Sequence, residues 1–144
     1  MIILDTSFLV AYHNERDVNH AAAGAIMSRF LTGEWGDGWL LEYVYLEVVT
    51  VLQIRLDLPT AVRVGEQLLG ARELAFHPCS DMFFATVDSF RHQPSGSGPN
   101  GLSFVDAAIV TAARWNPPGY VATFDAALKD SDGVTAVGSE GTLG

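Results

Sequence analysis

MIILDTSFLV, residues 1–10, is an apolar run with an acid at its fifth position, and this stretch decides the fold. Residues 1–4 carry no polar side chain, which is the pattern of a strand buried on both faces of a parallel sheet. Asp5 follows at the carboxyl end of this strand, where open α/β sheets bind their ligands. The opening stretch therefore predicts an α/β fold with a functional acid at one edge of the sheet.

Strand and helix patterns alternate through the rest of the chain. Further strands are predicted at residues 39–41, 74–79, 120–124 and 134–137, the second of these in the centre of the sheet. Helices are predicted at residues 6–12, 20–32, 43–56, 58–70, 81–92 and 103–115. This alternation predicts a three-layer α/β/α sandwich around a mostly parallel central sheet.

Three of the predicted helices begin at residues suited to capping. Asp57 stands before a helix with proline in its first turn, and Ser80 precedes the helix at 81–92. Ser103 stands three residues before Asp106, a capping-box arrangement with Asp in place of the usual Glu or Gln.

Length and composition favour one domain over residues 1–144. The only low-complexity segment, PSGSGPNG at residues 94–101, has the length of a flexible loop rather than of a domain linker. The single cysteine, Cys79, excludes an internal disulfide. No stretch approaches the ~20 apolar residues of a membrane span, and no basic leader precedes the first strand, so we expect a cytoplasmic protein.

Four acids lie inside or at the end of apolar segments: Asp5, Glu47 in YVYLEVVTVL, Asp106 in GLSFVDAAIV and Asp125 in YVATFDAAL. An unpaired ionised carboxylate is costly to desolvate in such surroundings. Oxygen ligands from separated points of a fold suit Mg²⁺ or Mn²⁺. Since Asp5 and Asp125 both follow strands of a parallel sheet, they converge at one edge, and we expect the two helices to bring the other acids there.

Each acid also has a purely structural interpretation. Asp106 could serve only its helix cap, and Asp125 could be only a strand-to-helix turn residue. Asp5 and Glu47 are harder to explain in this way, since one ends a buried strand and the other interrupts an apolar helix face.

The charge balance opposes a polyanionic partner. Seventeen acidic and eight basic residues give a formal net charge of −9. A nuclease that binds its substrate partly through metal ions needs only a local basic rim, however. The overall charge does not say where the candidates for such a rim lie: Arg55, Arg63, Arg91 and Arg114.

Four segments of the chain resemble the PIN-domain family, especially VapC-like toxins of prokaryotic toxin–antitoxin pairs. They are ILDTS at residues 3–7, YVYLEVVTVLQIR at 43–55, LSFVDAAIVTAA at 102–113 and VATFDAAL at 121–128. Their order and spacing are those of the family, and together they cover nearly the whole chain. The resemblance implies a PIN-like fold.

The resemblance also implies a function, that of a metal-dependent endoribonuclease acting on RNA. Its Mg²⁺ or Mn²⁺ would be bound by Asp5, Glu47, Asp106 and Asp125. Thr6 or Ser7 matches a position that assists through its hydroxyl or backbone, and Asp130 or Asp132 stands where some members have a further acid. A small antitoxin protein is the implied partner, which would block the site with a basic side chain.

The helix at residues 43–56 predicts a homodimer surface as well. Val44, Val48 and Val51 are spare apolar residues on this helix, although the same residues could complete the core.

Three other functions remain open. The first is a catalytically silent PIN-fold binding or scaffold module. The second is a phosphotransfer enzyme of the haloacid-dehalogenase type, which needs a second aspartate where this chain has Ser7. The third is a response-regulator-like receiver, for which Lys129 is suitably late but no acidic pair accompanies Asp5.

Overall fold

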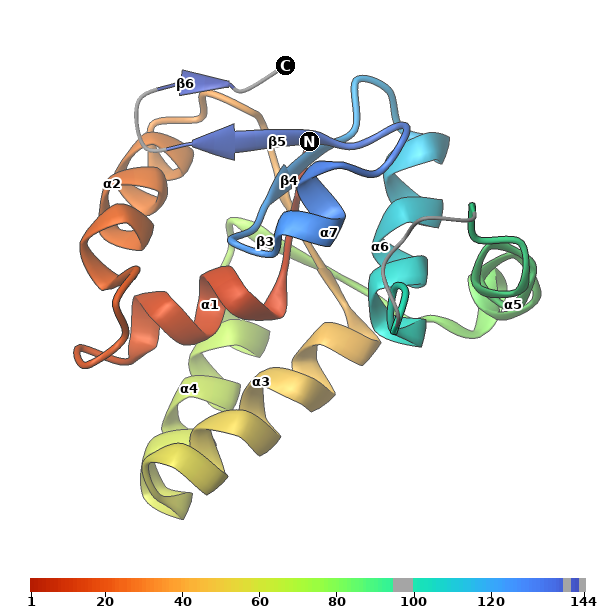
Figure 1. Ribbon diagram of the computed structural model, residues 1–144. Helices are drawn as coiled ribbons and strands as arrows, with labels where there is room; N and C mark the ends of the chain where they lie inside the picture. The colour runs from red at the N-terminus through yellow and green to blue at the C-terminus, as the bar shows by residue number, and fades with distance from the viewer. Residues whose placement is uncertain (95–99, 139–140, 143–144) are drawn as a thin grey trace.

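A six-stranded sheet with the order β3-β2-β1-β4-β5-β6 forms the centre of the molecule. The structure, a computed structural model, describes residues 1–94, 100–138 and 141–142 (Figure 1). The first five strands in this order pair in parallel, and β6 pairs antiparallel with β5. The strands are β1 (Ile2–Leu4), β2 (Gly38–Leu41), β3 (Leu74–His77), β4 (Tyr120–Ala122), β5 (Thr135–Gly138) and β6 (Gly141–Thr142).

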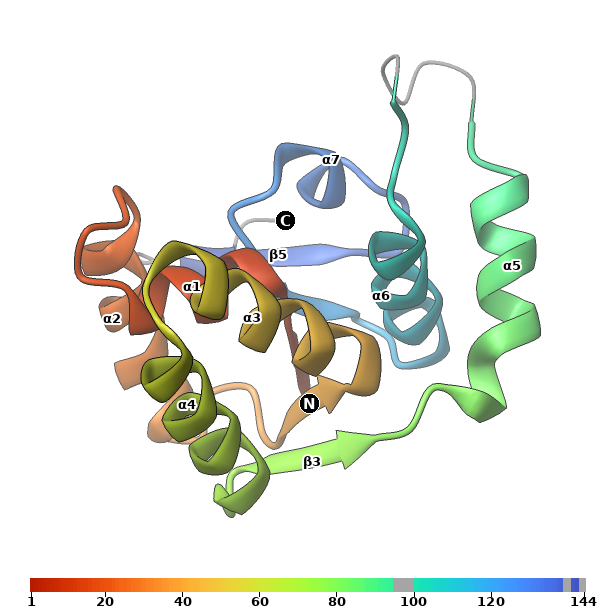
Figure 2. The ribbon, with the colours of Figure 1, turned by 90° about the horizontal axis from the view of Figure 1, so that it is seen from below.

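Helices cover both faces of this sheet. They are α1 (Thr6–His13), α2 (His20–Leu31), α3 (Glu42–Arg55), α4 (Leu58–Gly70), α5 (Phe83–Arg91), α6 (Phe104–Trp115) and α7 (Ala126–Lys129). Figure 2 shows α1, α2 and α4 on one side of the molecule and α5 and α6 on the other. The predicted three-layer α/β/α fold is therefore confirmed. Within the described residues, no helix is both long enough and apolar enough to cross a membrane.

The first strand occupies the centre of the sheet, as its apolar sequence predicts. β1 lies between β2 and β4 and pairs in parallel with both. All three of its side chains are fully buried. The backbone N–H of Asp5 donates to the carbonyl of Ala122 at 3.0 Å, so the carboxyl ends of β1 and β4 are joined directly. The acids that follow these two strands therefore reach the same edge of the sheet.

Two of the predicted helix caps are confirmed. The Asp57 carboxylate accepts the backbone N–H of Thr60 at 2.7 Å, with proline in the first turn of α4. At the start of α6, Ser103 and Asp106 form both bonds of a capping box. The third predicted cap, Ser80, is not confirmed. Ser80 begins a 3₁₀ turn, η1 (Ser80–Met82), and α5 starts only after this turn.

The prediction for residues 74–79 is wrong in position and in length. β3 is an edge strand that pairs with β2, and Phe76 on it is 44% exposed. It ends at His77, because Pro78 has no N–H to continue the ladder. An alternating pattern identifies a strand but does not give its neighbours, so the sequence could not place this one.

Other differences concern shorter segments. The strand predicted at 120–124 ends at Ala122, and beyond it the backbone N–H groups of Phe124 and Asp125 donate to side-chain hydroxyls. The short helix α7 and the strand β6 were not predicted. Residues 95–99 of the predicted glycine-rich loop lie outside the described residues.

The helix face predicted to form a homodimer surface is instead part of the core. Val44 and Val48 are fully buried, together with Leu52 one turn further on. This spacing of four residues makes a continuous stripe on one side of α3. Leu46 lies outside the stripe and is 54% exposed. Val44 and Val48 thus stabilise the fold and are not available to a partner, whereas Val51 is only half-buried.

We predict that two Leu→Ala substitutions on this one helix differ sharply in their effect. Leu52→Ala leaves a cavity in the core and should lower the free energy of unfolding by about 2–5 kcal/mol. Leu46→Ala, the matched control, should change it by no more than about 0.5 kcal/mol. Urea denaturation followed by circular dichroism measures both, and equal losses would contradict the assignment of the buried face.

Candidate functional site

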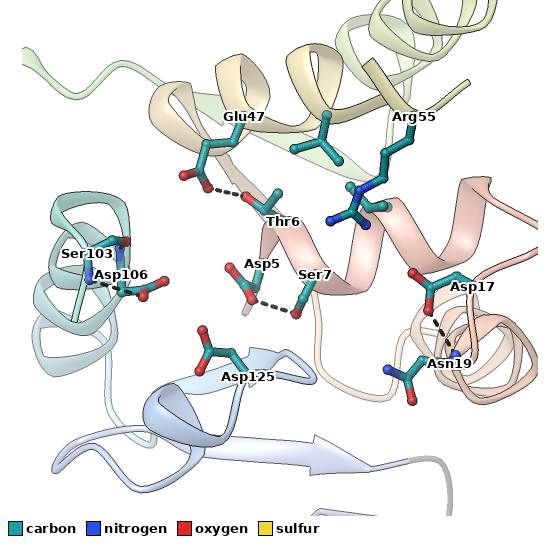
Figure 3. A pocket seen from close by; sticks show the side chains of 12 residues that line it. Asp5, Thr6, Ser7, Asp17, Asn19, Glu47, Arg55, Ser103, Asp106 and Asp125 are labelled. Atoms are coloured by element: carbon teal, nitrogen blue, oxygen red, sulfur yellow. Dashed lines mark hydrogen bonds between the residues drawn. The ribbon is translucent and has the colours of Figure 1, made fainter. Parts of the chain in front are cut away.

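A pocket of about 330 Å³ lies where the carboxyl ends of β1 and β4 meet the helices (Figure 3). All four acids predicted from the sequence line it, together with both predicted supporting hydroxyl residues. The lining residues are Asp5, Thr6, Ser7, Val10, Asp17, Asn19, Glu47, Val51, Arg55, Ser103, Asp106 and Asp125. The structure thus brings together acids that are up to 120 positions apart in the chain, from Asp5 to Asp125.

The four acids come from four different elements. Asp5 stands between β1 and α1, and Glu47 projects from the second turn of α3. Asp106 lies in the first turn of α6, and Asp125 caps α7 after β4. Figure 3 shows their carboxylates directed toward a common space. No local segment of the chain could assemble this group.

Asp5 is the most deeply buried of the acids and the most firmly held. It is 3% exposed, and its Oδ2 accepts hydrogen bonds from the Ser7 and Thr123 hydroxyls, each at 2.7 Å. Each hydroxyl oxygen also accepts a backbone N–H at 2.9 Å, that of Phe124 for Ser7 and that of Asp125 for Thr123. The turn after β4 therefore fixes the orientation of the carboxylate that follows β1.

Thr123 is a residue that sequence reasoning missed. It lies within the VATFDAAL segment, and it is buried with its hydroxyl bonded to a residue 118 positions away. A threonine between apolar residues of a strand was the only available signal, and β-branched residues are common in strands for other reasons. Its role therefore became visible only in the folded chain.

Glu47 is held by the other predicted hydroxyl residue. The Thr6 hydroxyl donates to Glu47 Oε1 at 2.7 Å, which ties α1 to α3. Glu47 is half-buried, as are Asp106 and Asp125. The desolvation cost expected of acids in apolar segments therefore falls mainly on Asp5, while the other three stay partly exposed to solvent.

The structural roles of Asp106 and Asp125 are present but use only part of each carboxylate. Oδ2 of Asp106 accepts the Ser103 N–H at 3.3 Å, and Oδ1 of Asp125 accepts the Ala127 N–H at 2.8 Å. An ionised carboxylate has two oxygens and about four acceptor positions. Capping a helix and binding a cation are therefore compatible in both residues.

Negative charge accumulates in the pocket, and none of the four acids forms an ion pair within the described residues. Burial raises the pKa of Asp5, an effect partly offset by the hydrogen bonds from Thr123 and Ser7. Burial, followed by the charges of Asp5 and Asp125, raises the pKa of Asp106 to about 6. Such pKa shifts arise where carboxylates are buried, and neighbouring carboxylates without a cation to balance them add to the effect.

The donor types suit Mg²⁺ or Mn²⁺, since hard cations prefer carboxylate oxygens. In the part of the chain that the structure describes, however, no three His, Cys, Asp or Glu side chains are grouped closely enough to hold one ion as they stand. Like charges repel, so ionised carboxylates without a cation favour separation. The site therefore fits the cation in chemistry, and the acids would have to draw closer together to bind it.

Two further acids suggested by the resemblance lie elsewhere. Asp130 and Asp132 are exposed and do not line the pocket. The backbone carbonyl of Asp132 accepts a hydrogen bond from Arg114 Nε at 3.1 Å, a contact between α6 and the polar turn after α7. In contrast, Asp17 and Asn19 line the pocket although the sequence gave no reason to select them, and Arg55, one of the four arginines named for a basic rim, lines it too.

We predict that Asp106→Asn stabilises the metal-free protein at pH 7. A carboxyl group whose pKa is raised on folding favours the folded state below about pH 4, and this stabilisation is lost as pH rises through 6. The asparagine keeps an oxygen for the Ser103 N–H and removes the repelling charge. Allowing for solvent screening, we expect a gain of about 1 kcal/mol, or about 3 °C in Tm.

The measurement is thermal unfolding in EDTA at pH 4 and pH 7. Asp132→Asn removes the same charge outside the pocket and should show no such gain in Tm between pH 4 and pH 7. An Asp106→Asn protein no more stable than the wild type at pH 7 would contradict the repulsion in the pocket.

Comparisons with known proteins agree with the fold. The family model described as PIN domain matches residues 2–133. VapC20 of Mycobacterium tuberculosis, described as a toxin that cleaves the sarcin-ricin loop, has a similar structure, with a TM-score of 0.74 at 22% sequence identity. The match covers 90% of this chain and 93% of that one. A comparison with curated protein sequences gives no match. Because the family model spans nearly the whole chain, this protein belongs to the PIN-domain family.

Proposed function

We propose that this protein is a divalent-metal-dependent endoribonuclease, and that it is the toxin of a toxin–antitoxin pair. The observation that carries the proposal is the pocket in which four carboxylates from four separate elements point at one space. The structural likeness to VapC20, a toxin that cleaves RNA in the sarcin-ricin loop, supports the same assignment. The proposed substrate is RNA, and the proposed partner is a small antitoxin that presents a basic side chain to the acids.

Asp5, Glu47, Asp106 and Asp125 would hold Mg²⁺ or Mn²⁺. When bound, such a cation lowers the pKa of water and neutralises charge on a phosphoryl group. We assign Asp5 and Asp106 as direct ligands, with Glu47 and Asp125 binding directly, through water, or by orienting the attacking water. The hydroxyls of Ser7 and Thr123 set the orientation of Asp5 before any ligand arrives.

The reaction we propose is in-line attack of water on the phosphorus of a phosphodiester. The P–O bond to the 3′ oxygen breaks, which leaves a 3′-hydroxyl and a 5′-phosphate. The pocket residues position the phosphate and the attacking water for this geometry, and preorganised positioning is a large part of such catalysis. A different outcome, a cyclic 2′,3′-phosphate, would require the ribose 2′-hydroxyl as the nucleophile.

A silent binding module of the same fold is the main alternative, and the cleavage assay below separates it from the nuclease. The haloacid-dehalogenase alternative loses support from the site itself. Its second aspartate would stand at Ser7, whose hydroxyl here donates to Asp5 and orients it. Homodimerisation stays a prediction, which light scattering would test. Its surface is not the one first expected, because Val44 and Val48 are buried in the core.

We predict that RNA cleavage requires the metal ion and Asp5. A mixed RNA substrate should be cut in Mg²⁺ or Mn²⁺ and remain intact in EDTA. Asp5→Asn should lower the rate at least about 100-fold, because it removes a charged ligand that acts at the reacting phosphate. Asp132→Asn, outside the pocket, should cleave at the wild-type rate, and the products should carry 5′-phosphates. Cleavage that persists in EDTA, or cyclic phosphate products, would refute the mechanism.

We also predict that Mg²⁺ or Mn²⁺ raises the melting temperature of the protein. A ligand that binds only the folded state stabilises it by mass action, and here it would relieve the repulsion among the acids as well. Asp5→Asn should lose most of this response, whereas Asp132→Asn should keep it. An undiminished shift in the Asp5 variant would show that the ion binds elsewhere.

A further inference from the structure

Arg55 is the one basic residue among the twelve that line the pocket. It is the last residue of α3, and it is exposed. Figure 3 shows its side chain extending from α3 toward the same space as the acids, on the side near Asp17 and Asn19. The pocket therefore has an acidic part and, at its other side, a single positive charge.

The geometry of α3 sets the relation between Arg55 and the acids. Glu47, Val51 and Arg55 all line the pocket, and their spacing of four residues puts them on one face of the helix. At 1.5 Å per residue, Arg55 stands about 12 Å beyond Glu47 along the axis. Helical side chains lean toward the N-terminus of their helix, so Arg55 leans back over the pocket.

The Arg55 guanidinium makes no ion pair or side-chain hydrogen bond within the described residues. The ion pairs found there are Arg29 with Glu34 and His92 with Asp88. Asp17, which lines the same pocket, uses Oδ1 to accept the Asn19 N–H at 2.9 Å and does not pair with Arg55. Arg29 shows the contrast, since it also donates to the carbonyl of Gly138 and lies over the Trp35 ring.

Five N–H donors in a planar fork thus face the pocket without a partner, and phosphate is the group whose geometry best matches that fork. The net charge of −9 makes such a contact necessary, because a polyanion is repelled by the molecule as a whole. The four acids cannot supply this contact, because they carry negative charge themselves. We infer that Arg55 binds a backbone phosphate of the RNA, next to the one that is cut, and so positions the strand across the acids.

The separation along α3 selects which phosphate this is. Since Arg55 stands about two helical turns from Glu47, the phosphate it holds belongs to a neighbouring nucleotide and not to the bond that breaks. Arg55 is accordingly a positioning residue that acts on substrate binding. The inference rests on the proposed function for its substrate class, RNA.

The experiment measures binding separately from cleavage. The probe is a fluorescent pool of single-stranded, random-sequence oligoribonucleotides with phosphorothioate linkages, confirmed intact on a gel after each titration. Fluorescence anisotropy in Mg²⁺ at several KCl concentrations gives Kd and its salt dependence for the wild type, Arg55→Ala and Arg55→Lys. Arg91→Ala is the matched control, since Arg91 is also an exposed arginine that ends a helix but lies outside the pocket.

Arg55→Ala should weaken binding about tenfold, the usual effect of one charged hydrogen-bonding group. The slope of log K against log salt should fall in magnitude by about 0.7, the value for one phosphate contact on a single strand. Arg55→Lys keeps the charge and should restore the slope, and Arg91→Ala should match the wild type. With a cleavable RNA, Arg55→Ala should raise KM about tenfold and change kcat little.

Equal binding and equal salt slopes for Arg55→Ala and Arg91→Ala would overturn the inference, as would a wild type that does not bind the pool at low salt. Failure of the proposed function looks different. In that case the wild type binds RNA and Arg55→Ala reduces the salt dependence of binding, but the protein does not cut RNA in Mg²⁺ or Mn²⁺. The inference then holds for Arg55 as part of an RNA-binding site.

Discussion

The buried carboxylate of Asp5 is the constraint on which the site depends. A carboxyl group with 3% exposure at the end of the central strand must have its oxygens satisfied, or the cost of burial falls on the fold. Ser7 and Thr123 meet this need by donating to one oxygen, and the backbone of the turn after β4 supports both hydroxyls. The hydrogen bonds that the Asp5 carboxyl group needs thereby fix how the ends of β1 and β4 join, and they place Asp125 beside the same pocket.

Two of the acids in the pocket stabilise helix ends and also add to its excess of negative charge. Asp106 and Asp125 each cap a helix with one oxygen and leave the remainder of the carboxylate facing the pocket. The raised pKa of Asp106 reflects its burial first and then the repulsion from Asp5 and Asp125. A site of this kind lowers the stability of the metal-free protein, and functional sites commonly carry such a cost. Binding of a cation would remove it, so the proposed activity and the stability of the fold depend on the same ion.

One face of helix α3 packs in the core, and another face lines the pocket. Val44, Val48 and Leu52 pack inside, whereas Glu47, Val51 and Arg55 line the pocket. Because apolar residues occur nearly all round this helix, its sequence shows little periodicity, and the buried face could not be selected from it. This is the reason that two core valines were assigned to a dimer surface. Arg55 was named among the arginines, but only the fold showed which of them lines the pocket.

The sequence by itself determined the features that depend on near neighbours in the chain. The buried first strand, the caps at Asp57 and Ser103 and the acids at strand and helix ends follow from periodicity and from hydrogen bonds across three or four residues. Tertiary structure decided the features that depend on distant partners. The edge position of β3, the bond from Thr123 to Asp5 across 118 residues and the placement of Arg55 all depend on strand order and helix orientation. These are set by packing of the whole chain, which no local pattern encodes.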